Sequence, residues 1–125
     1  MAAARVWPES EIVASDIDPV AVEVAEANLI ANGLAGAVQV VEAAGLDHPA
    51  LAGPFDLVLA NILKGPLVDL APAIGRATAA DGRAILSGLL AEQGDEVAAA
   101  AAAAGFEEIA RGADGDWITL TLGRA

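Results

Sequence analysis

The sequence predicts a layered α/β domain with a mostly parallel sheet that closes in an antiparallel hairpin. Short runs of β-forming residues alternate with helical segments, and glycine or proline separates them. Near the C-terminus, two strand-like runs flank "GADGD", whose glycines and aspartates suit a hairpin turn. The 125 residues are enough for one domain with a hydrophobic core.

Each expected element is bounded by turn residues or by a change in periodicity. The expected strands are residues 12–15, 38–41, 55–60, 84–87, 107–111 and 117–122. The expected helices are residues 19–31, 66–78 and 92–104. Asp81 and Gly82 predict a turn before the fourth strand, and alanine propensity favours the last helix, which should end at Gly105.

Composition and charge limit the classes of partner. The alanine-rich tract at residues 97–104 is too short and too weakly hydrophobic to cross a bilayer, and residues 1–6 do not resemble a signal peptide. With no cysteine as well, the sequence favours a cytoplasmic location without a membrane partner. The net charge of -12 disfavours direct binding to nucleic acid and suits a basic protein. A purely solubilising role for this charge is the simpler interpretation.

The stretch "SDIDP" places two carboxylates between the first strand and the first helix. Asp18 directly precedes Pro19, so its side chain can cap the unpaired N–H groups of the helix while proline takes the first helical position. Asp16 lies where the strand ends, at the edge of a parallel sheet where ligands bind. A carboxylate there can accept both hydroxyls of a ribose, although a solvated loop aspartate explains the residue equally well.

A second polar side chain is expected at the same edge of the sheet. In "FDLVLANIL" the apolar run of the third strand ends at Asn61. Because the carboxyl ends of parallel strands meet at one edge, we expect the Asn61 amide to lie beside Asp16. This pairing favours a nucleotide-type ligand over a solvated loop.

Several longer motifs resemble one enzyme family. They are "SDIDPVAVEVAEANLIANG", "ANIL" followed by "PL", "GPLVDLAP", "DGRAILSGLLAEQ" and "AAAAGFEE". Together they resemble the methyltransferases of ribosomal protein L11, the PrmA family, from about residue 12 to the C-terminus. The resemblance implies a Rossmann-like class I methyltransferase that uses S-adenosylmethionine and has ribosomal protein L11 as its substrate.

The resemblance also implies which residues form the site. Asp16 is expected to hold the ribose of the cofactor, and Ile17 to pack on its adenine. The other expected cofactor-binding residues belong to the "EAAGL" turn and to the end of the third strand: Ala43, Ala44, Gly45 and Asn61. No metal ligand is expected.

Asn61 is also the expected catalytic residue, because it would face the methyl group. The transfer is an in-line displacement on an already activated methyl, so positioning is the main contribution of the protein. The amine nucleophile must be neutral. An amide oxygen in a desolvated site would lower the pKa of the amine and aim its lone pair.

One part of the family pattern is not found in this sequence. The first strand of the family, which is central in its sheet, and the glycine-rich loop after it should lie just upstream of Ile12, where the chain reads "MAAARVWPESE". The N-terminal substrate-recognition domain is not found either. We therefore expect a partial methyltransferase domain over residues 1–125, inactive by itself, with a gap in the sheet between the strands around Val13 and Val58.

Two other functional classes stay open. A nicotinamide-binding dehydrogenase domain also places an acid after its second strand, but it needs a "GxGxxG" loop and does not explain "ANIL" or the hairpin. A non-catalytic α/β interaction fragment is the third possibility. His48 is expected in a loop, and Ser87 lacks a "GxSxG" setting and a histidine partner for nucleophilic catalysis. Trp117 is expected in the core of the hairpin rather than as a substrate platform.

Overall fold

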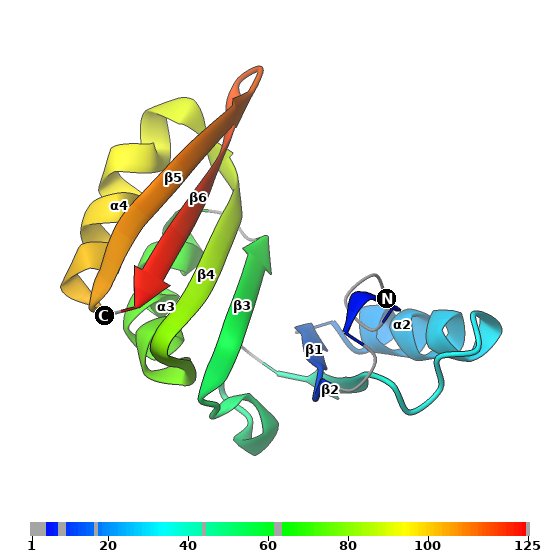
Figure 1. The fold of residues 1–125 in the computed structure, drawn as a ribbon. Helices are drawn as coiled ribbons and strands as arrows, with labels where there is room; N and C mark the ends of the chain where they lie inside the picture. The colour runs from blue at the N-terminus through cyan, green and yellow to red at the C-terminus, as the bar shows by residue number, and fades with distance from the viewer. Residues whose placement is uncertain (1–4, 8–9, 17, 44, 62–63, 125) are drawn as a thin grey trace. The chain divides into compact units, whose positions relative to one another are not determined.

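The computed structural model describes residues 5–7, 10–16, 18–43, 45–61 and 64–124. The chain forms two compact units, Met1–Leu51 and Ala52–Ala125, and each contains its own sheet (Figure 1). The first sheet has two strands and the second has four. None of the helices in these segments has the length and hydropathy that a bilayer crossing needs.

The first unit is built around a β-α-β connection. β1 (Val13–Asp16) pairs in parallel with β2 (Gln39–Glu42), and α2 (Pro19–Ala31) joins them. Asp18 is the N-cap of α2, and its Oδ1 accepts the backbone N–H of Val20 at 2.9 Å. Pro19 occupies the start of the helix, where its missing N–H costs nothing. The predicted cap is therefore confirmed.

The core of the first unit is small. Val41, Ala43 and Leu51 form a buried cluster, against which Val13, Leu46 and Ala50 pack, and Leu29 of α2 is buried as well. A short 3₁₀ helix, Pro49–Leu51, closes this core. His48 lies in the loop before it, as predicted, and its Nδ1 accepts the N–H of Ala50 at 3.0 Å.

The second unit contains a four-stranded sheet in the order β3-β4-β6-β5. The strands are β3 (Phe55–Asn61), β4 (Thr78–Leu90), β5 (Phe106–Asp114) and β6 (Trp117–Arg124). β3 and β4 are parallel, whereas β6 pairs antiparallel with both β4 and β5. The predicted α/β fold with a terminal antiparallel hairpin is thus confirmed.

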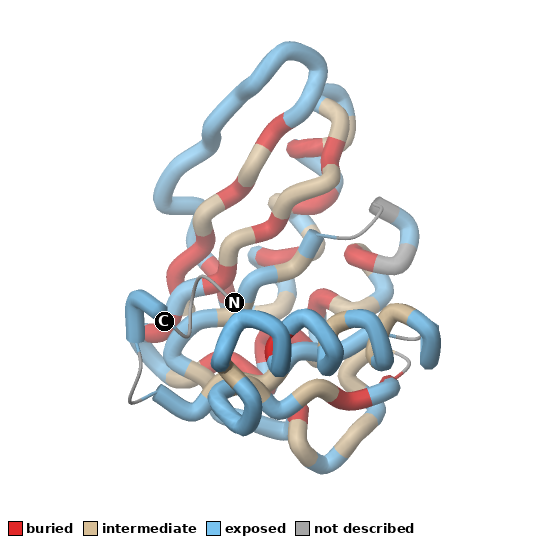
Figure 2. The backbone as a smooth tube through the Cα atoms, turned by 90° about the vertical axis from the view of Figure 1, so that its right-hand side faces the viewer, coloured by how far each residue is buried: buried red, intermediate tan, exposed pale blue. Residues whose placement is uncertain are grey.

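The helices α3 (Lys64–Ala77) and α4 (Gly94–Ala103) cover one face of this sheet (Figure 1). Buried positions alternate along β4 and β6, which is the pattern of strands with one covered face (Figure 2). The core residues of the strands and helices are Ala84, Leu86, Leu89, Phe106, Ile118, Leu120, Leu122, Leu67, Ala71, Ile74, Ala77, Val97 and Ala101. The opposite face of the sheet carries Leu57 and Leu59, which are 37% and 63% exposed.

Two arginines, Arg124 and Arg111, join strands to helix ends in this unit. Arg124 Nη1 donates to the backbone carbonyls of Gly75 and Thr78 at 2.7 and 2.8 Å, where α3 ends. Arg111 on β5 donates to Glu108 at 2.6 Å and to Asp95, in the first turn of α4, at 3.1 Å. The hydrogen bond with Glu108, followed by that with Asp95, raises the pKa of Arg111.

Most element boundaries shift by one or two residues from those predicted, and the larger differences are in the second unit. β4 begins at Thr78, because Thr78 already pairs with Phe55. The next pair of this ladder joins Arg83 to Leu57. The predicted turn lies between Thr78 and Arg83, where Asp81 has a φ of 63°. A 3₁₀ turn, Ala91–Gln93, precedes α4, so the regular helix starts later than residue 92. The hairpin strands are longer than predicted because a two-residue loop joins them, with Gly115 at a φ of 61°.

The strands on either side of the expected gap belong to different sheets. Among the strands of the described segments, β1 pairs with β2 alone and β3 with β4 alone. The expected gap for a strand between Val13 and Val58 stays a prediction.

Candidate functional site

The carboxyl ends of β1 and β2 bring together two of the predicted cofactor-binding residues. Asp16 pairs with Glu42, and the Asp16 carbonyl accepts the N–H of Ala43 at 3.0 Å. Gly45 follows in the turn, with a φ of 59° that suits glycine. Ile17 and Ala44 lie outside the described residues.

The Asp16 carboxylate is held by the backbone yet exposed. Its Oδ1 accepts the N–H of Asp18 at 2.9 Å, so one oxygen has a fixed direction. A carboxylate offers about four acceptor positions over its two oxygens. The group can therefore keep this bond and still accept hydrogen bonds from a pair of hydroxyls.

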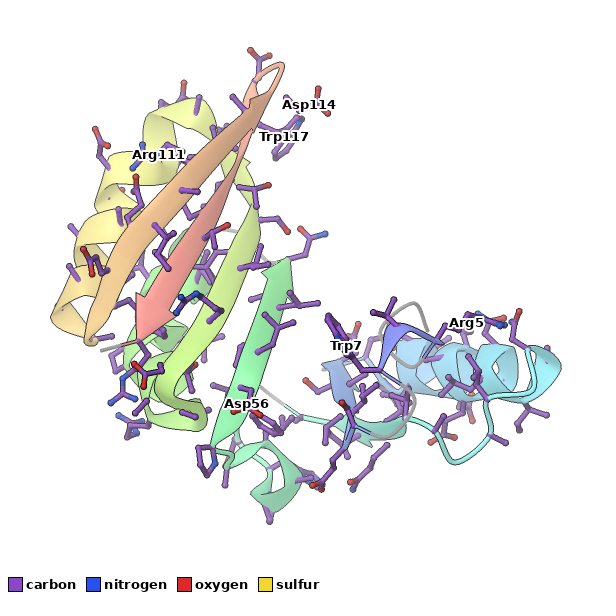
Figure 3. All side chains as sticks on the ribbon, viewed as in Figure 1. Arg5, Trp7, Asp56, Arg111, Asp114 and Trp117 are labelled. Atoms are coloured by element: carbon purple, nitrogen blue, oxygen red, sulfur yellow. The ribbon has the colours of Figure 1, made fainter. Side chains whose placement is uncertain are left out.

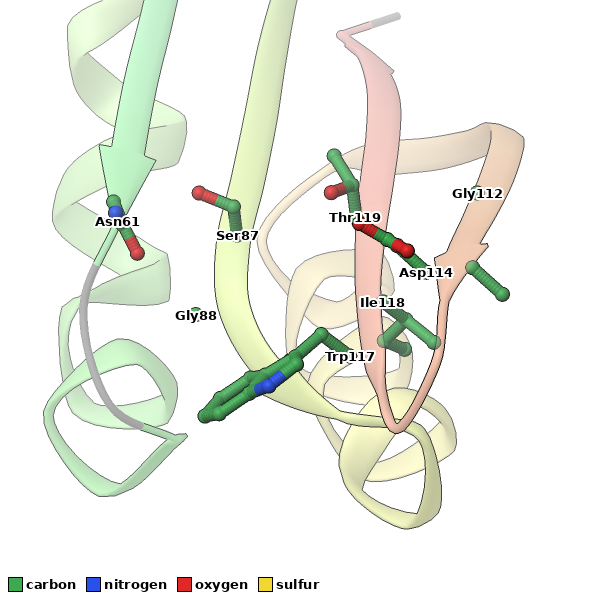
Figure 4. A pocket seen from close by; sticks show the side chains of 9 residues that line it. Asn61, Ser87, Gly88, Gly112, Asp114, Trp117, Ile118 and Thr119 are labelled. Carbon is green, nitrogen blue, oxygen red and sulfur yellow. The ribbon is translucent and has the colours of Figure 1, made fainter.

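Asn61 is the last residue of β3 and lines a pocket in the second unit. The pocket has a volume of about 670 Å³ and is formed by the ends of β3 and β4 together with the tip of the hairpin (Figure 4). Its lining residues are Asn61, Ser87, Gly88, Gly112, Ala113, Asp114, Trp117, Ile118 and Thr119. Asn61 pairs with Ser87 in the β3–β4 ladder, so their side chains stand on the same face of the sheet.

A bulge in β4 shapes this pocket. The register between β4 and β6 shifts between Leu86 and Leu89, and Gly88 has a φ of 81°. Such bulges bend a strand and are frequent next to active sites. The bend follows Ser87 directly, and Gly88 adds no side chain to the pocket that Asn61 and Ser87 share with the hairpin.

Trp117 does not lie in the core, so the prediction for this residue is wrong. Its side chain is 55% exposed and lines the pocket. The reason is strand alternation: Ile118, Leu120 and Leu122 occupy the covered face of β6, so Trp117 and Thr119 must take the other face. The polar threonines in "WITLTL" carried this signal in the sequence.

Sequence reasoning also missed Asp114. It is the last residue of β5, is exposed, and pairs directly with Trp117 across the hairpin. In Figure 3 the two side chains lie next to each other at the hairpin tip. The signal was the hairpin register, which places the residues flanking a two-residue loop opposite one another.

The pocket offers hydrogen-bond acceptors rather than an acid–base pair. Its described polar side chains are an amide, two hydroxyls and one carboxylate, from Asn61, Ser87, Thr119 and Asp114. Such groups can accept N–H donors and orient an amine. The only histidine of the sequence, His48, belongs to the other compact unit, so Ser87 has no catalytic partner of the serine-hydrolase type among the residues that line the pocket.

Sequence comparison relates the whole chain to one family. The family model of ribosomal protein L11 methyltransferase (PrmA) matches residues 1–125. The ribosomal protein L11 methyltransferase of Chelativorans sp. strain BNC1 is 43% identical over 115 residues, which are 90% of this chain and 40% of that protein. The corresponding protein of Brucella suis strain ATCC 23445 is 47% identical over 102 residues, or 80% and 35% of the two chains.

Solved structures give the same relationship. The ribosomal protein L11 methylase of Lactobacillus delbrueckii subsp. bulgaricus superimposes with a TM-score of 0.84 at 30% identity, over 92% of this chain and 58% of that one. A TehB-like SAM-dependent methyltransferase from Corynebacterium glutamicum shares the fold, with a TM-score of 0.67 at 17% identity, over 91% and 67% of the two chains. The chain thus has the class I methyltransferase fold and spans about two-fifths of the curated relatives.

Proposed function

The chain belongs to the ribosomal protein L11 methyltransferase (PrmA) family, and from this premise we propose that it supplies the acceptor site, and part of the cofactor site, of an S-adenosylmethionine-dependent protein N-methyltransferase. Ribosomal protein L11 is the proposed substrate, which also implies a cytoplasmic reaction. The observation that carries the proposal is the position of Asn61, at the carboxyl end of β3 in a pocket lined by oxygen acceptors.

The residues at the end of β1 suit the proposed cofactor. The exposed Asp16 carboxylate has one oxygen fixed by the Asp18 N–H and can accept the two hydroxyls of a ribose. On the turn after β2, Gly45 has no side chain to obstruct a flat ring, and Ala43 contributes its backbone there because its side chain is buried in the core of the first unit. When bound, S-adenosylmethionine supplies a methyl group activated by the adjacent sulfonium.

In the proposed reaction Asn61 positions the acceptor amine. Its amide oxygen accepts an N–H of the amine, which aims the nitrogen lone pair away from the amide. Removal of water from around the amine disfavours the ammonium form and so lowers the pKa of the amine. An amine that is neutral and correctly oriented needs no general base in the displacement step, so orientation is the main contribution of the protein.

A chimeric enzyme tests this function. This chain would replace the matching 115-residue segment of the Chelativorans relative, which supplies the upstream part. We expect the chimera to transfer labelled methyl groups from S-adenosylmethionine to ribosomal protein L11 and to ignore NAD in a binding titration. A chimera that folds and binds NAD instead of S-adenosylmethionine would contradict the proposal.

Two substitutions in the chimera separate the proposed roles. Asn61→Ala should lower kcat about 100-fold, the scale of losing one positioned hydrogen-bonding group, while cofactor affinity stays within about tenfold. Asp16→Ala should instead weaken cofactor binding by about 1.5–3 kcal/mol, the scale of hydrogen bonds to a charged group. Calorimetry gives the affinities, and initial rates give kcat. If Asn61→Ala lowered thermal stability and turnover in parallel, Asn61 would be structural.

A further inference from the structure

We propose that Trp117 and Asp114 form a docking site for the protonated amine of a lysine side chain, at the hairpin side of the pocket that Asn61 lines. The inference rests on the proposed function for the identity of the substrate and adds how its cationic group is first recognised. Neither residue takes part in the positioning role given to Asn61.

The hairpin register places the indole and the carboxylate together. Asp114 and Trp117 form the last pair of the β5–β6 ladder. Directly opposite residues of antiparallel strands share a face and have Cβ atoms about 4.5–5.5 Å apart. Both residues therefore stand on the same face of the hairpin and both line the pocket, with the indole on its β4 side and the carboxylate nearer Thr119 (Figure 4).

The indole is accessible on the pocket side. Trp117 is 55% exposed, and in Figure 4 its ring extends from β6 toward the β3 side of the pocket. Glycines keep this region open: a Cβ built at Gly112 meets no atom within 4 Å. An exposed tryptophan offers a large aromatic surface to a ligand.

The residues that line the pocket include no lysine or arginine that could neutralise the Asp114 carboxylate. The nearest arginine along β5 is Arg111, which pairs with Leu120, a residue of the covered face. Its guanidinium is already bonded to Glu108 and Asp95. The Asp114 carboxylate and the Trp117 ring are thus available to a cation from another molecule.

The chemistry of the pair selects an ammonium group. A cation over an indole face is attracted by the ring quadrupole, and tryptophan is the best of the aromatic residues for this contact. The Asp114 carboxylate adds a negative charge, which attracts a cation but does not favour a neutral or anionic ligand. The net charge of -12 favours the approach of a basic segment. The docked amine loses its proton to the surrounding water before it reaches Asn61 in neutral form.

The two tryptophans of the chain provide a direct assay. Nα-acetyl-lysine methylamide is titrated into the 125-residue chain while the indole N–H signals are followed by NMR. The signals are assigned with Trp7→Phe, and Trp7, which is 49% exposed, serves as the internal control. We expect a saturable shift of the Trp117 signal at millimolar ligand, little shift of the Trp7 signal, and no shift with the uncharged Nε-acetylated analogue. Equal shifts of both indoles, or equal shifts with both ligands, would overturn the docking site.

Matched variants test the two side chains. Asp114→Asn should weaken lysine binding about three- to tenfold, whereas Asp116→Asn, which removes the same charge from the hairpin loop outside the pocket, should change it less than about twofold. Trp117→Leu should abolish the binding, and Trp117→Phe should retain part of it. Methyl signals of the core residue Leu120 report that each variant is folded. Identical affinities for the two aspartate variants would refute the role of Asp114.

The docking site and the proposed function can fail separately. The titration needs neither cofactor nor turnover. If the 125-residue chain binds lysine at Trp117 but the chimera does not methylate ribosomal protein L11, only the proposed function is contradicted. A chimera that methylates ribosomal protein L11 with the same KM in its wild-type, Asp114→Asn and Trp117→Leu forms would sink the docking site alone.

Discussion

Asp16 and Asp18 stand two residues apart and form successive links of one hydrogen-bond chain. Asp18 donates its N–H to the Asp16 carboxylate and accepts the Val20 N–H with its own side chain. Asp18 thereby starts α2, and at the same time its backbone fixes the direction of the Asp16 carboxylate. Substitution of the side chain at residue 18 leaves that N–H in place, so the two roles can be separated.

Asp18→Ala should therefore destabilise α2 without removing the hydrogen bond to Asp16. The loss of an N-cap side chain costs about 1 kcal/mol. Asp18→Asn, which keeps an acceptor oxygen, should cost only a few tenths of this amount. Amide hydrogen exchange of the α2 backbone measures the change. Equal protection in the alanine and wild-type chains would show that the cap does not stabilise the helix.

Features that depend on neighbouring residues could be predicted from the sequence, whereas features that depend on the register and packing of strands could not. The cap at Asp18 follows from "DP" before a helical run, and the end of β3 follows from the change from apolar residues to Asn61. The position of Trp117 at the start of the last strand predicts a core residue of the hairpin, but the structure exposes it. Its exposure depends on which face of β6 the helices cover, and that is fixed by packing against α4.

At the scale of elements, α3 and α4 approach each other closely at one glycine. Ala104 is the C-cap residue of α4. A Cβ added at Gly75 would lie 2.6 Å from the Ala104 carbonyl oxygen and 3.3 Å from the Ala104 Cβ. The main obstacle is backbone, so it cannot rotate away. Gly75 thus sets how closely the two helices pack under the sheet that forms the pocket.

Gly75→Ala should lower the free energy of unfolding of the second unit. The clash costs about 1–3 kcal/mol, and the better helix propensity of alanine returns up to about 1 kcal/mol. Gly65→Ala is the matched control, because it lies in the same helix and its Cβ would meet no atom within 4 Å. It should stabilise the unit by about 0.5 kcal/mol. Urea unfolding, followed by the fluorescence of Trp117 in a Trp7→Phe background, measures the stability of both variants. Equal destabilisation by Gly75→Ala and Gly65→Ala would contradict the close approach of the two helices.

Elements were easier to predict than their pairing. The alternation of strands and helices was visible in the sequence, and the terminal hairpin was indicated by "GADGD". The bulge at Gly88 is not predicted, because the expected strand, residues 84–87, ends before this glycine. It arises from fitting β4 against β6 with a register that shifts between Leu86 and Leu89. Long-range pairing of this kind leaves little trace in a local pattern.

At the scale of the whole molecule, the predicted ribose ligand and the predicted acceptor-binding residue belong to different compact units. Asp16 is in the first unit and Asn61 in the second. Neither the sequence around Asp16 nor that around Asn61 consists of a strand, a glycine-rich turn and a helix in that order, which is the usual binding motif of a nucleotide cofactor. Prediction of the cofactor residues therefore depended on family resemblance, since no local motif in these residues specifies them.

The 125 residues by themselves should consequently bind S-adenosylmethionine at least about 100-fold more weakly than the chimera does, a difference that corresponds to about 2.7 kcal/mol. Equilibrium dialysis with labelled cofactor measures both affinities. The Asp16→Ala chimera provides a reference for the loss of one ligand. Saturable micromolar binding by the 125 residues would mean that another segment approaches the methionine part of the cofactor.

The single pairing of β3 has a consequence for handling the protein. Among the strands that the structure describes, only β4 pairs with β3, which leaves the N–H and C=O groups on its other side without a strand partner there. This side lies next to the exposed Leu57 and Leu59, and Asp56 is the only charge in the strand. Such a segment can template intermolecular cross-β aggregation, which natural proteins suppress with gatekeeper lysines. Leu59→Lys should therefore slow the growth of light scattering by the concentrated chain, whereas Leu57→Ile should not. Purification of the wild-type chain should accordingly lose material with a steep dependence on concentration.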